Sequence, residues 1–419
     1  MTSKSPVWHP FTQHAVQPEA PLISKGEGAW LTTADGRRIF DAISSWWVVT
    51  HGHRHPHIMQ AIKRQTDQLD QVIFAGFTHE PAEALARRLV AITPPQLEYV
   101  FFSDSGSTSV EVALKMALGF WRHRGENRSR ILALEGAYHG DTIGGMSIGA
   151  RGIFNAPYDP LLFDVERLPF PSEGREQATL EALSAACGLG TIAALIVEPL
   201  ILGAGGMLIY PPWVLAEMKR ICKTHDVLFI ADEVMTGWGR TGTLFACEQA
   251  GVAPDIGCYS KGLTGGSLPL AVTLARADIF DAHYSTDRTK TFFHSSSYTA
   301  NPIACAAALA NLEIWADEPV MARIARLSSL HSERLDRFRD DRRFTNVRQL
   351  GTIAALDLVA SDAGYMATIG PALYQRFMAR GLLVRPLGNA IYIMPPYCST
   401  EGELDLVYEA IGEIADEIA

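Results

Sequence analysis

The chain of 419 residues lacks several features that would each point to a particular class of protein. It has no run of lysine and arginine, and its formal net charge is −10, which argues against a general nucleic-acid binder. The first eleven residues contain no apolar segment, so we expect no signal peptide. None of the six cysteines forms a C-x-x-C pair, and scattered thiols of this kind are typical of a cytoplasmic protein.

A stretch of low charge, residues 188–210, resembles a membrane span on hydropathy alone, because Glu198 is its single charged residue. Pro199 follows that charge, and glycines stand at 203, 205 and 206. A central charge next to proline is unfavourable in a membrane helix. We therefore expect a buried strand followed by a glycine-rich loop, and no contact with a membrane.

Beyond about Pro81, short β-rich runs alternate with helical patterns. The strands are apolar on both faces, which is typical of a covered, mostly parallel sheet. This pattern predicts an α/β fold. The expected strands are 99–102, 131–134, 193–197, 227–231 and 269–274, and the expected helices include 80–91, 108–121 and 213–223.

The two ends of the chain predict a second, smaller α+β domain. Asp35-Gly36 between apolar runs indicates a hairpin. After about residue 311 we expect a long helix, and strands near 352–359, 382–385 and 390–394. The pair Thr400 and Glu403 is a capping box that begins a final helix. We expect a large domain at 51–310, and a small domain made of 1–50 with 311–419.

The chemistry is centred on Asp232 and Lys261, each of which follows an apolar run. They are about one βαβ repeat apart, on the order of 30 residues, so they should project from neighbouring strand ends into one crevice. A buried carboxylate stabilises the protonated ring nitrogen of pyridoxal phosphate (PLP), and a desolvated lysine bonds to its aldehyde. Taken singly, the two residues are more often a strand-end cap and a surface lysine. A phosphate-binding loop elsewhere in the sequence makes the cofactor-binding interpretation of this pair the better one.

That loop is Ser105-Gly106-Ser107-Thr108, between a strand and a helix. Gly106 can adopt a positive φ, and the free N–H groups of a helix start bind phosphate. The alternative is an ordinary helix cap. Tyr138 follows the next strand, where its ring could stack on a cofactor, although a lone tyrosine is more often a core residue.

Two further features have competing interpretations. His51, His53, His55 and His57 alternate, as ligands on one strand face would, but no partner ligands accompany them, so we expect no metal. Arg385 follows an apolar run and suits a substrate carboxylate, and an exposed arginine is an equally good interpretation.

At these residues, and over nearly the whole chain, the sequence resembles the class III aminotransferases of PLP fold type I. The resemblance rests on five motifs, which are 105–107, 138–142, 231–242, 260–262 and 301–302. Segments 8–13, 44–47, 385–386 and 391–397 resemble one subfamily in particular. Its members convert 8-amino-7-oxononanoate to 7,8-diaminononanoate in biotin biosynthesis, usually with S-adenosyl-L-methionine as the amino donor.

The resemblance implies a role for each matching residue. Lys261 would bond to the cofactor, Asp232 would pair with its ring nitrogen and Tyr138 would stack on its ring. The remaining implied cofactor contacts are Ser105, Gly106, Ser107, Ser296 and Ser297, of which Ser297 would act in the partner subunit of a homodimer. The implied substrate contacts are Trp46, Asp141, Arg385 and Tyr392. In this family each active site is built from both subunits.

Three departures from the subfamily pattern bear on the substrates. Phe11 stands where some members have tyrosine, Leu387 where an aromatic residue is frequent, and Ser297 where threonine is common. The change at Ser297 is chemically mild, whereas Phe11 and Leu387 define the amino donor less closely than the acceptor, with lysine as the other candidate donor. A related transaminase acting on ornithine or 4-aminobutyrate is the nearest alternative. A dinucleotide-binding oxidoreductase would need a complete G-x-G-x-x-G motif, which the glycines at 203, 205 and 206 do not form. A PLP-binding regulator would need a basic DNA-binding segment, which the sequence lacks.

Overall fold

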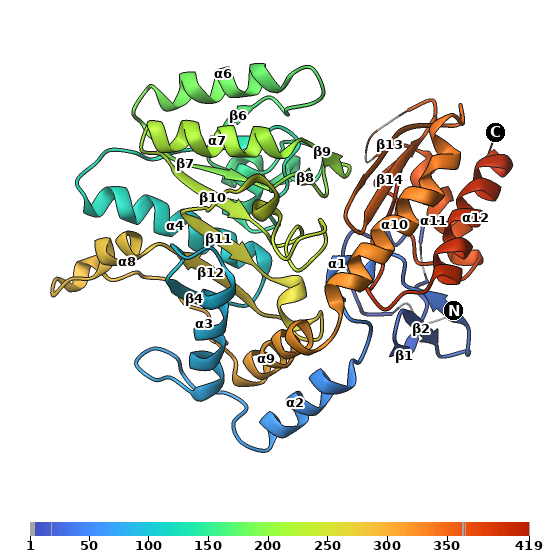
Figure 1. Cartoon of the computed structure of the whole chain (residues 1–419), viewed down its shortest axis with the longest axis horizontal. Helices are drawn as coiled ribbons and strands as arrows, with labels where there is room; N and C mark the ends of the chain where they lie inside the picture. Colours follow the sequence, from blue (N-terminus) through green and yellow to red (C-terminus); the bar gives the residue numbers. More distant parts are fainter. Residues whose placement is uncertain (1–4, 18, 363, 365, 419) are drawn as a thin grey trace.

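The computed structural model describes residues 5–418 except 18, 363 and 365, and it has two units side by side (Figure 1). The larger unit contains a seven-stranded sheet with the order β4-β12-β11-β10-β7-β5-β6. Only β12 runs antiparallel to its neighbours, so the predicted α/β fold with a mostly parallel sheet is confirmed. The strands are β4 (Tyr99–Ser103), β5 (Arg130–Leu134), β6 (Glu166–Leu168), β7 (Ile192–Val197), β10 (Leu228–Asp232), β11 (Ile256–Tyr259) and β12 (Ala271–Ala275).

Helices cover both faces of this sheet, because its central strands are apolar on both sides. In β7, Ala194 and Ile196 face the cluster around α4 (Gly106–His123), while Leu195 and Val197 face α6 (Glu176–Cys187) and α7 (Pro212–Thr224). All six residues of β7 are buried. The other helices of this unit are α2 (Pro56–Thr66), α3 (Glu80–Ile92), α5 (Ile143–Ile148), α8 (Ala277–His283) and α9 (Pro302–Asp317).

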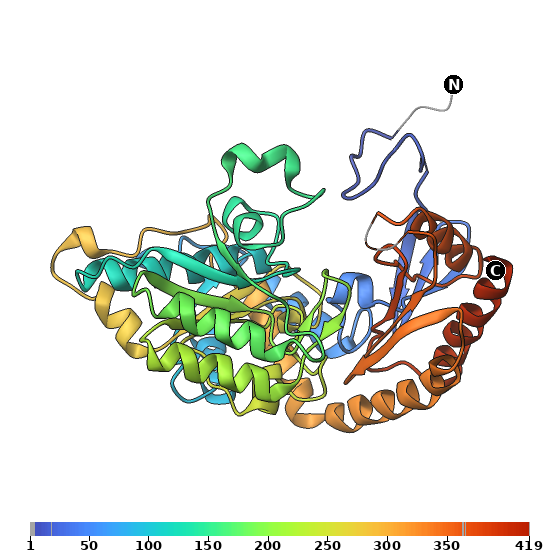
Figure 2. The same ribbon diagram turned by 90° about the horizontal axis from the view of Figure 1, so that it is seen from above.

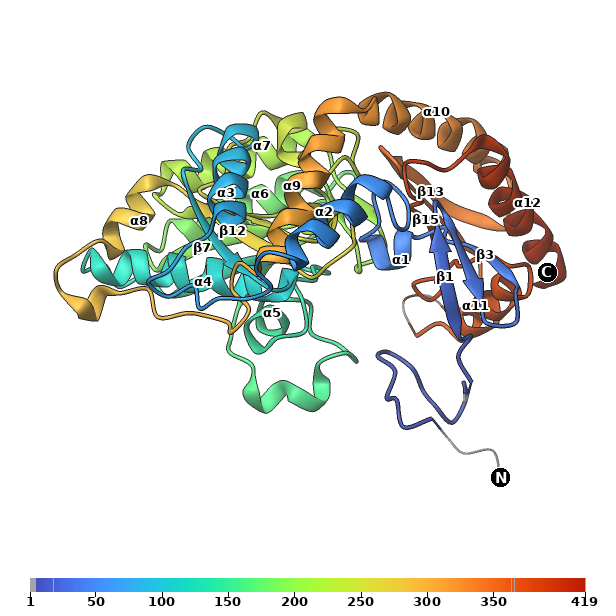
Figure 3. The same ribbon diagram turned by 90° about the horizontal axis from the view of Figure 1, so that it is seen from below.

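The smaller unit combines the two ends of the chain, and α10 (Val320–Arg339) leads into it from α9 (Figure 3). Its sheets are β1 (Ile23–Glu27), β2 (Trp30–Thr33) and β3 (Arg38–Phe40), and β13 (Phe344–Leu350), β14 (Ile353–Leu358) and β15 (Ala390–Ile393). Phe40 shares one core with Leu382 and Leu404, which joins the N-terminal hairpin to the C-terminal elements. The remaining helices are α1 (Ser44–Trp47), α11 (Ile369–Ala379) and α12 (Glu401–Ile418).

Most of the expected elements of this unit are present. The β2–β3 hairpin turns at Asp35-Gly36, and Thr400 and Glu403 form the capping box at the start of α12. The strand expected at 382–385 is wrong: only Leu382 forms a bridge, with Phe40, and Pro386 has no N–H with which to extend a ladder. The boundary expected at 310/311 falls inside α9, and the division into domains stays a prediction.

Residues 188–210 form β7, a loop and the short strands β8 (Ile201–Leu202) and β9 (Leu208–Ile209), which agrees with the expected strand and glycine-rich loop. Among the described residues, no helix is long and apolar enough to cross a membrane.

Candidate active site

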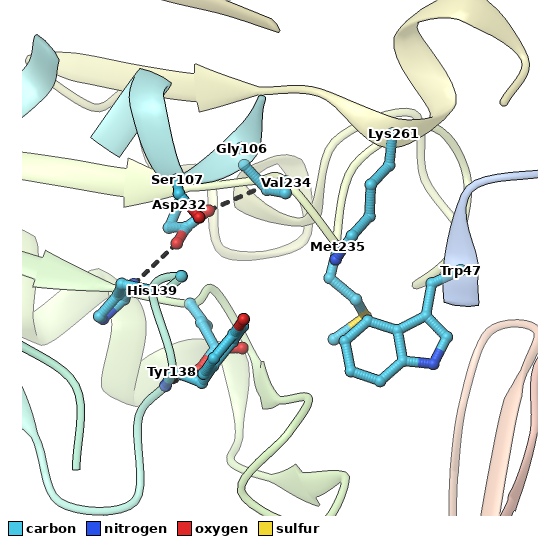
Figure 4. A pocket seen from close by; sticks show the side chains of 11 residues that line it. Trp47, Gly106, Ser107, Tyr138, His139, Asp232, Val234, Met235 and Lys261 are labelled. Atoms are coloured by element: carbon cyan, nitrogen blue, oxygen red, sulfur yellow. Dashed lines mark hydrogen bonds and ion pairs between the residues drawn. The ribbon is translucent and has the colours of Figure 1, made fainter. Parts of the chain in front are cut away.

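A cavity of about 130 Å³ lies at the carboxyl ends of β10 and β11 (Figure 4). These strands are parallel neighbours, so Asp232 and Lys261 reach the same cavity, as their spacing predicted. The residues that line it are Trp47, Gly106, Ser107, Tyr138, His139, Gly140, Glu198, Asp232, Val234, Met235 and Lys261.

Asp232 is held firmly at the end of β10, where only 4% of its surface is exposed. Its Oδ2 lies 2.7 Å from Nδ1 of His139, and its Oδ1 accepts a hydrogen bond from the Val234 N–H at 3.1 Å. His139 thus orients the carboxylate, a role that its position beside Tyr138 in the sequence did not suggest. A carboxylate fixed in this way can hold a cationic N–H group.

Lys261 begins the 3₁₀ turn η3 (Lys261–Thr264) with a φ of 49°, a conformation that side-chain-bearing residues rarely adopt. Its Nζ lies 4.5 Å from the centroid of the Trp47 ring. Burial lowers the pKa of the amine to about 8, although the charges of Asp232 and Glu198 act in the opposite direction. The amine is therefore largely available as a nucleophile and base in mildly alkaline solution.

The start of α4 faces the cavity through Gly106 and Ser107. The Ser105 hydroxyl accepts from the Thr108 N–H at 3.3 Å, so it caps the helix, as the alternative interpretation held. The expected use of a positive φ at Gly106 is wrong. The glycine is required for space instead, because a Cβ there would lie 2.6 Å from Cγ1 of Val234.

Tyr138 borders the cavity beside Glu198, whose role the sequence did not reveal. The Tyr138 N–H donates to Oε1 of Glu198 at 2.9 Å, and the Gly203 N–H donates to Oε2 at 2.9 Å. Burial raises the pKa of Glu198 to about 7, and burial beside Asp141 raises that of Tyr138. A lone charge after an apolar strand was the signal that could have identified Glu198.

A second cavity of about 650 Å³ adjoins the first and shares Tyr138 and Gly140 with it. Asp141, Phe154 and Leu387 are among its lining residues, so both units contribute to it. It is large enough to accept an extended small molecule next to the first cavity.

Arg385 and Trp46 form a cluster with the N-terminal segment. The Arg385 Cζ lies 5.3 Å from the Trp46 ring centroid, and Nη2 donates to the Phe11 carbonyl at 3.1 Å. The Phe11 ring packs edge-on against the rings of Trp46 and Phe154, with ring centroids 5.3 Å and 6.0 Å away. In Figure 2 the N-terminal segment faces the loop that follows α5 and carries η1 (Ala156–Leu161).

Six of the predicted contacts are absent from the lining of both cavities, namely Trp46, Ser105 and Arg385, described above, and Tyr392, Ser296 and Ser297. Tyr392 is buried behind Trp47, whose indole N–H donates to its hydroxyl at 3.0 Å. Ser296 donates to Asp104, and Ser297 is exposed on the loop after η4 (Arg288–Lys290). Ser297 therefore does not reach either cavity of its own chain.

The alternating histidines each have a separate neighbour. The pairs are His51 with Asn311, His53 with Asp41, His55 with Glu318 and His57 with Glu313. Within the described part of the chain, no group of three or more His, Cys, Asp or Glu residues could hold a metal ion.

The residues of the first cavity fit PLP. Asp232 suits the ring nitrogen, the Lys261 amine suits the aldehyde, and the start of α4 suits the phosphate. When bound, the cofactor would supply an electron-withdrawing ring and a carrier for an amino group.

Comparison with known proteins gives the same assignment. The model of the aminotransferase class-III family matches residues 11–415. The adenosylmethionine-8-amino-7-oxononanoate aminotransferase of Synechococcus elongatus is 49% identical, with all of both chains covered. The crystal structure of the enzyme of that name from Methanocaldococcus jannaschii superposes with a TM-score of 0.93 at 35% identity, covering 98% of this chain and 97% of the other. A PLP-bound amine transaminase from an uncultivated Pseudomonas species gives a TM-score of 0.92 at 33% identity, with 98% of each chain covered. The chain therefore belongs to the class III aminotransferases, which depend on PLP.

Proposed function

We propose that this aminotransferase converts 8-amino-7-oxononanoate to 7,8-diaminononanoate in biotin biosynthesis, with S-adenosyl-L-methionine as the amino donor. The proposal is carried by Arg385. In the described part of the chain this arginine forms no ion pair. It lies against Trp46 and Phe11, and the Phe11 ring packs on Phe154, which lines the larger cavity. An apolar substrate chain ending in one carboxylate matches an aromatic wall ending in a guanidinium.

The side chains around the first cavity would divide the work of two half-reactions. The Lys261 amine removes the proton from the donor α-carbon and returns a proton in the acceptor half-reaction. Asp232, oriented by His139, holds the N–H of the cofactor ring. The N–H groups at the start of α4 hold the phosphate, and Trp47 and Met235 exclude water from the lysine.

A transaminase for ω-amino compounds is the second candidate. It is supported by the similarity to the omega-transaminase from Thermomicrobium roseum, which is 30% identical to this chain. The two candidates differ in their substrates, because an amine or ω-amino acid would serve as the amino donor and does not require a binding site for a single carboxylate at the end of an apolar chain.

A single-turnover screen would test the proposal. The PLP form of the enzyme is mixed separately with S-adenosylmethionine, lysine, ornithine and alanine, and the loss of the visible cofactor band is followed. We expect S-adenosylmethionine to bleach the band and 8-amino-7-oxononanoate to restore it. Bleaching by ornithine, with no recovery on addition of the oxo acid, would favour the second candidate.

We also propose that the enzyme is a cytoplasmic homodimer whose active sites combine residues of both subunits. The exposed position of Ser297 supports the dimer. Six free cysteines support a reducing compartment.

A further inference from the structure

Residues 203–207 form a tight turn, here called the glycine turn, between β8 and β9. The Gly203 carbonyl accepts from the N–H groups of Gly206 at 3.1 Å and Met207 at 3.0 Å. The turn packs closely on the active site. A Cβ at Gly205 would lie 2.4 Å from the Gly136 carbonyl oxygen, and one at Gly203 would lie 2.8 Å from Cε of Met235. Any shift of this turn would therefore displace the walls of both cavities.

Glu198 holds the turn on its active-site side. Its two carboxylate oxygens accept from Gly203 and from Tyr138, so one buried side chain joins the turn to the residue that borders the cofactor cavity. The Glu198 backbone is itself held in place, because its carbonyl accepts a hydrogen bond from the Tyr210 hydroxyl at 2.8 Å. A carboxylate that accepts two backbone N–H groups in a buried site is a strong link.

Arg348, from β13 of the smaller unit, holds the other side of the turn. Its Nε donates to the Met207 carbonyl at 2.9 Å, and its Nη2 donates to the Gly206 carbonyl. Asp357 of β14 pairs with the same guanidinium at 2.8 Å. The planar fork of arginine suits two carbonyls at once, whereas the three donors of a lysine ammonium spread from one nitrogen and do not match that geometry.

We propose that Glu198 and Arg348 are positioning residues that clamp the glycine turn from opposite sides and thereby fix Tyr138 against the bound cofactor. Neither residue takes part in the chemistry. The clamp ties the smaller unit to the cofactor site by hydrogen bonds that run from β13 through the turn to Tyr138. The inference rests on the PLP dependence of the family and not on the proposed oxo acid.

The test uses holoenzyme without any amino substrate, so its outcome is separate from that of the donor screen. The visible circular dichroism per bound cofactor reports how the ring is held. Arg348→Met should reduce this signal markedly and raise the dissociation constant of PLP about tenfold, the loss expected for a hydrogen bond to a charged group. Arg348→Lys should recover part of both losses.

Arg128→Met is the matched control, because Arg128 also donates to two successive loop carbonyls, those of His225 and Asp226, away from both cavities. We expect the control to leave the dichroism per cofactor unchanged. Equal signals in Arg348→Met and Arg128→Met would overturn the proposal.

A double-mutant cycle with Glu198→Ala tests the single clamp directly. If both residues act through one turn, the double variant should lose about as much PLP affinity as the worse single variant. If the fold-losses in PLP affinity of the two single variants multiply in the double variant, the residues act independently and the clamp is rejected. Should Arg348→Met fail to fold, Arg348→Lys with Glu198→Gln completes the same cycle, since glutamine still accepts one of the two N–H groups.

Discussion

Burial is the main reason for the lowered pKa of Lys261, and this has a consequence at the scale of a single residue. In apoenzyme, labelling of Lys261 by an amine-reactive reagent should rise with pH through a midpoint near 8. The charge of Asp232 raises the pKa of the lysine, so Asp232→Asn should move the midpoint to lower pH. Peptide mass spectrometry across a pH series measures both midpoints. A midpoint above 10 would mean that the amine is solvated.

Arg385 should matter in only one of the two half-reactions. Arg385→Ala removes the proposed partner of the oxo-acid carboxylate, so the apparent KM for the acceptor should rise by about 10- to 100-fold, the equivalent of a charged hydrogen bond. The donor half-reaction should change little. The apparent KM of Arg385→Lys for the acceptor should lie between those of the unsubstituted enzyme and Arg385→Ala. Stopped-flow measurement of each half-reaction separates the effects. A defect confined to the donor would mean that the arginine binds the other substrate.

The contacts of Glu198, rather than its presence in the site, could not be predicted from the sequence. Asp232 and Lys261 were identifiable because strand ends of a parallel sheet meet at one edge. The contacts of Glu198 join Tyr138 to Gly203, and no periodicity relates those positions. Likewise, Arg385 was recognised as a candidate, but its contact with the Phe11 carbonyl depends on a chain end that no pattern places.

At the scale of elements, the start of α4 depends on a single close contact. Gly106→Ala would place a methyl group against Val234, and such overpacking costs about 1–3 kcal/mol. We expect a lower melting temperature and weaker PLP binding. Val234→Ala added to the same chain should restore much of both, because it removes the two methyl groups that the new Cβ meets. Thermal unfolding and PLP titration of the three variants measure this, and a double variant no better than Gly106→Ala would refute the steric explanation.

Burial and apolar composition determined which elements could be predicted. Among the strands buried on both faces, β7 and β10 were located to within a residue. The expected strand 269–274 begins two residues before β12, and β11 was not among the expected strands. β13 was missed because most of its residues are polar or only partly buried. The segment 382–385 was read as a strand because it is apolar, yet it is buried against Phe40 with a single bridge. Apolar sequence predicts burial, and the pairing partner decides whether a strand forms.

At the scale of the whole molecule, the proposed dimer makes a prediction about which subunit supplies Ser297. Lys261→Ala and Ser297→Asp should each inactivate a homodimer, the first by removing the amine and the second by placing a negative charge near the cofactor phosphate. If Ser297 serves the partner's site, a mixed dimer of these two variants contains one site with both native residues. Random reassembly would then recover about a quarter of native activity, because half of the dimers are mixed and each has one intact site. If Ser297 serves its own subunit, each site of the mixed dimer carries one of the two substitutions, and no activity returns. Activity measured after joint unfolding and refolding of the two variants, with each variant refolded alone as the control, decides between these arrangements.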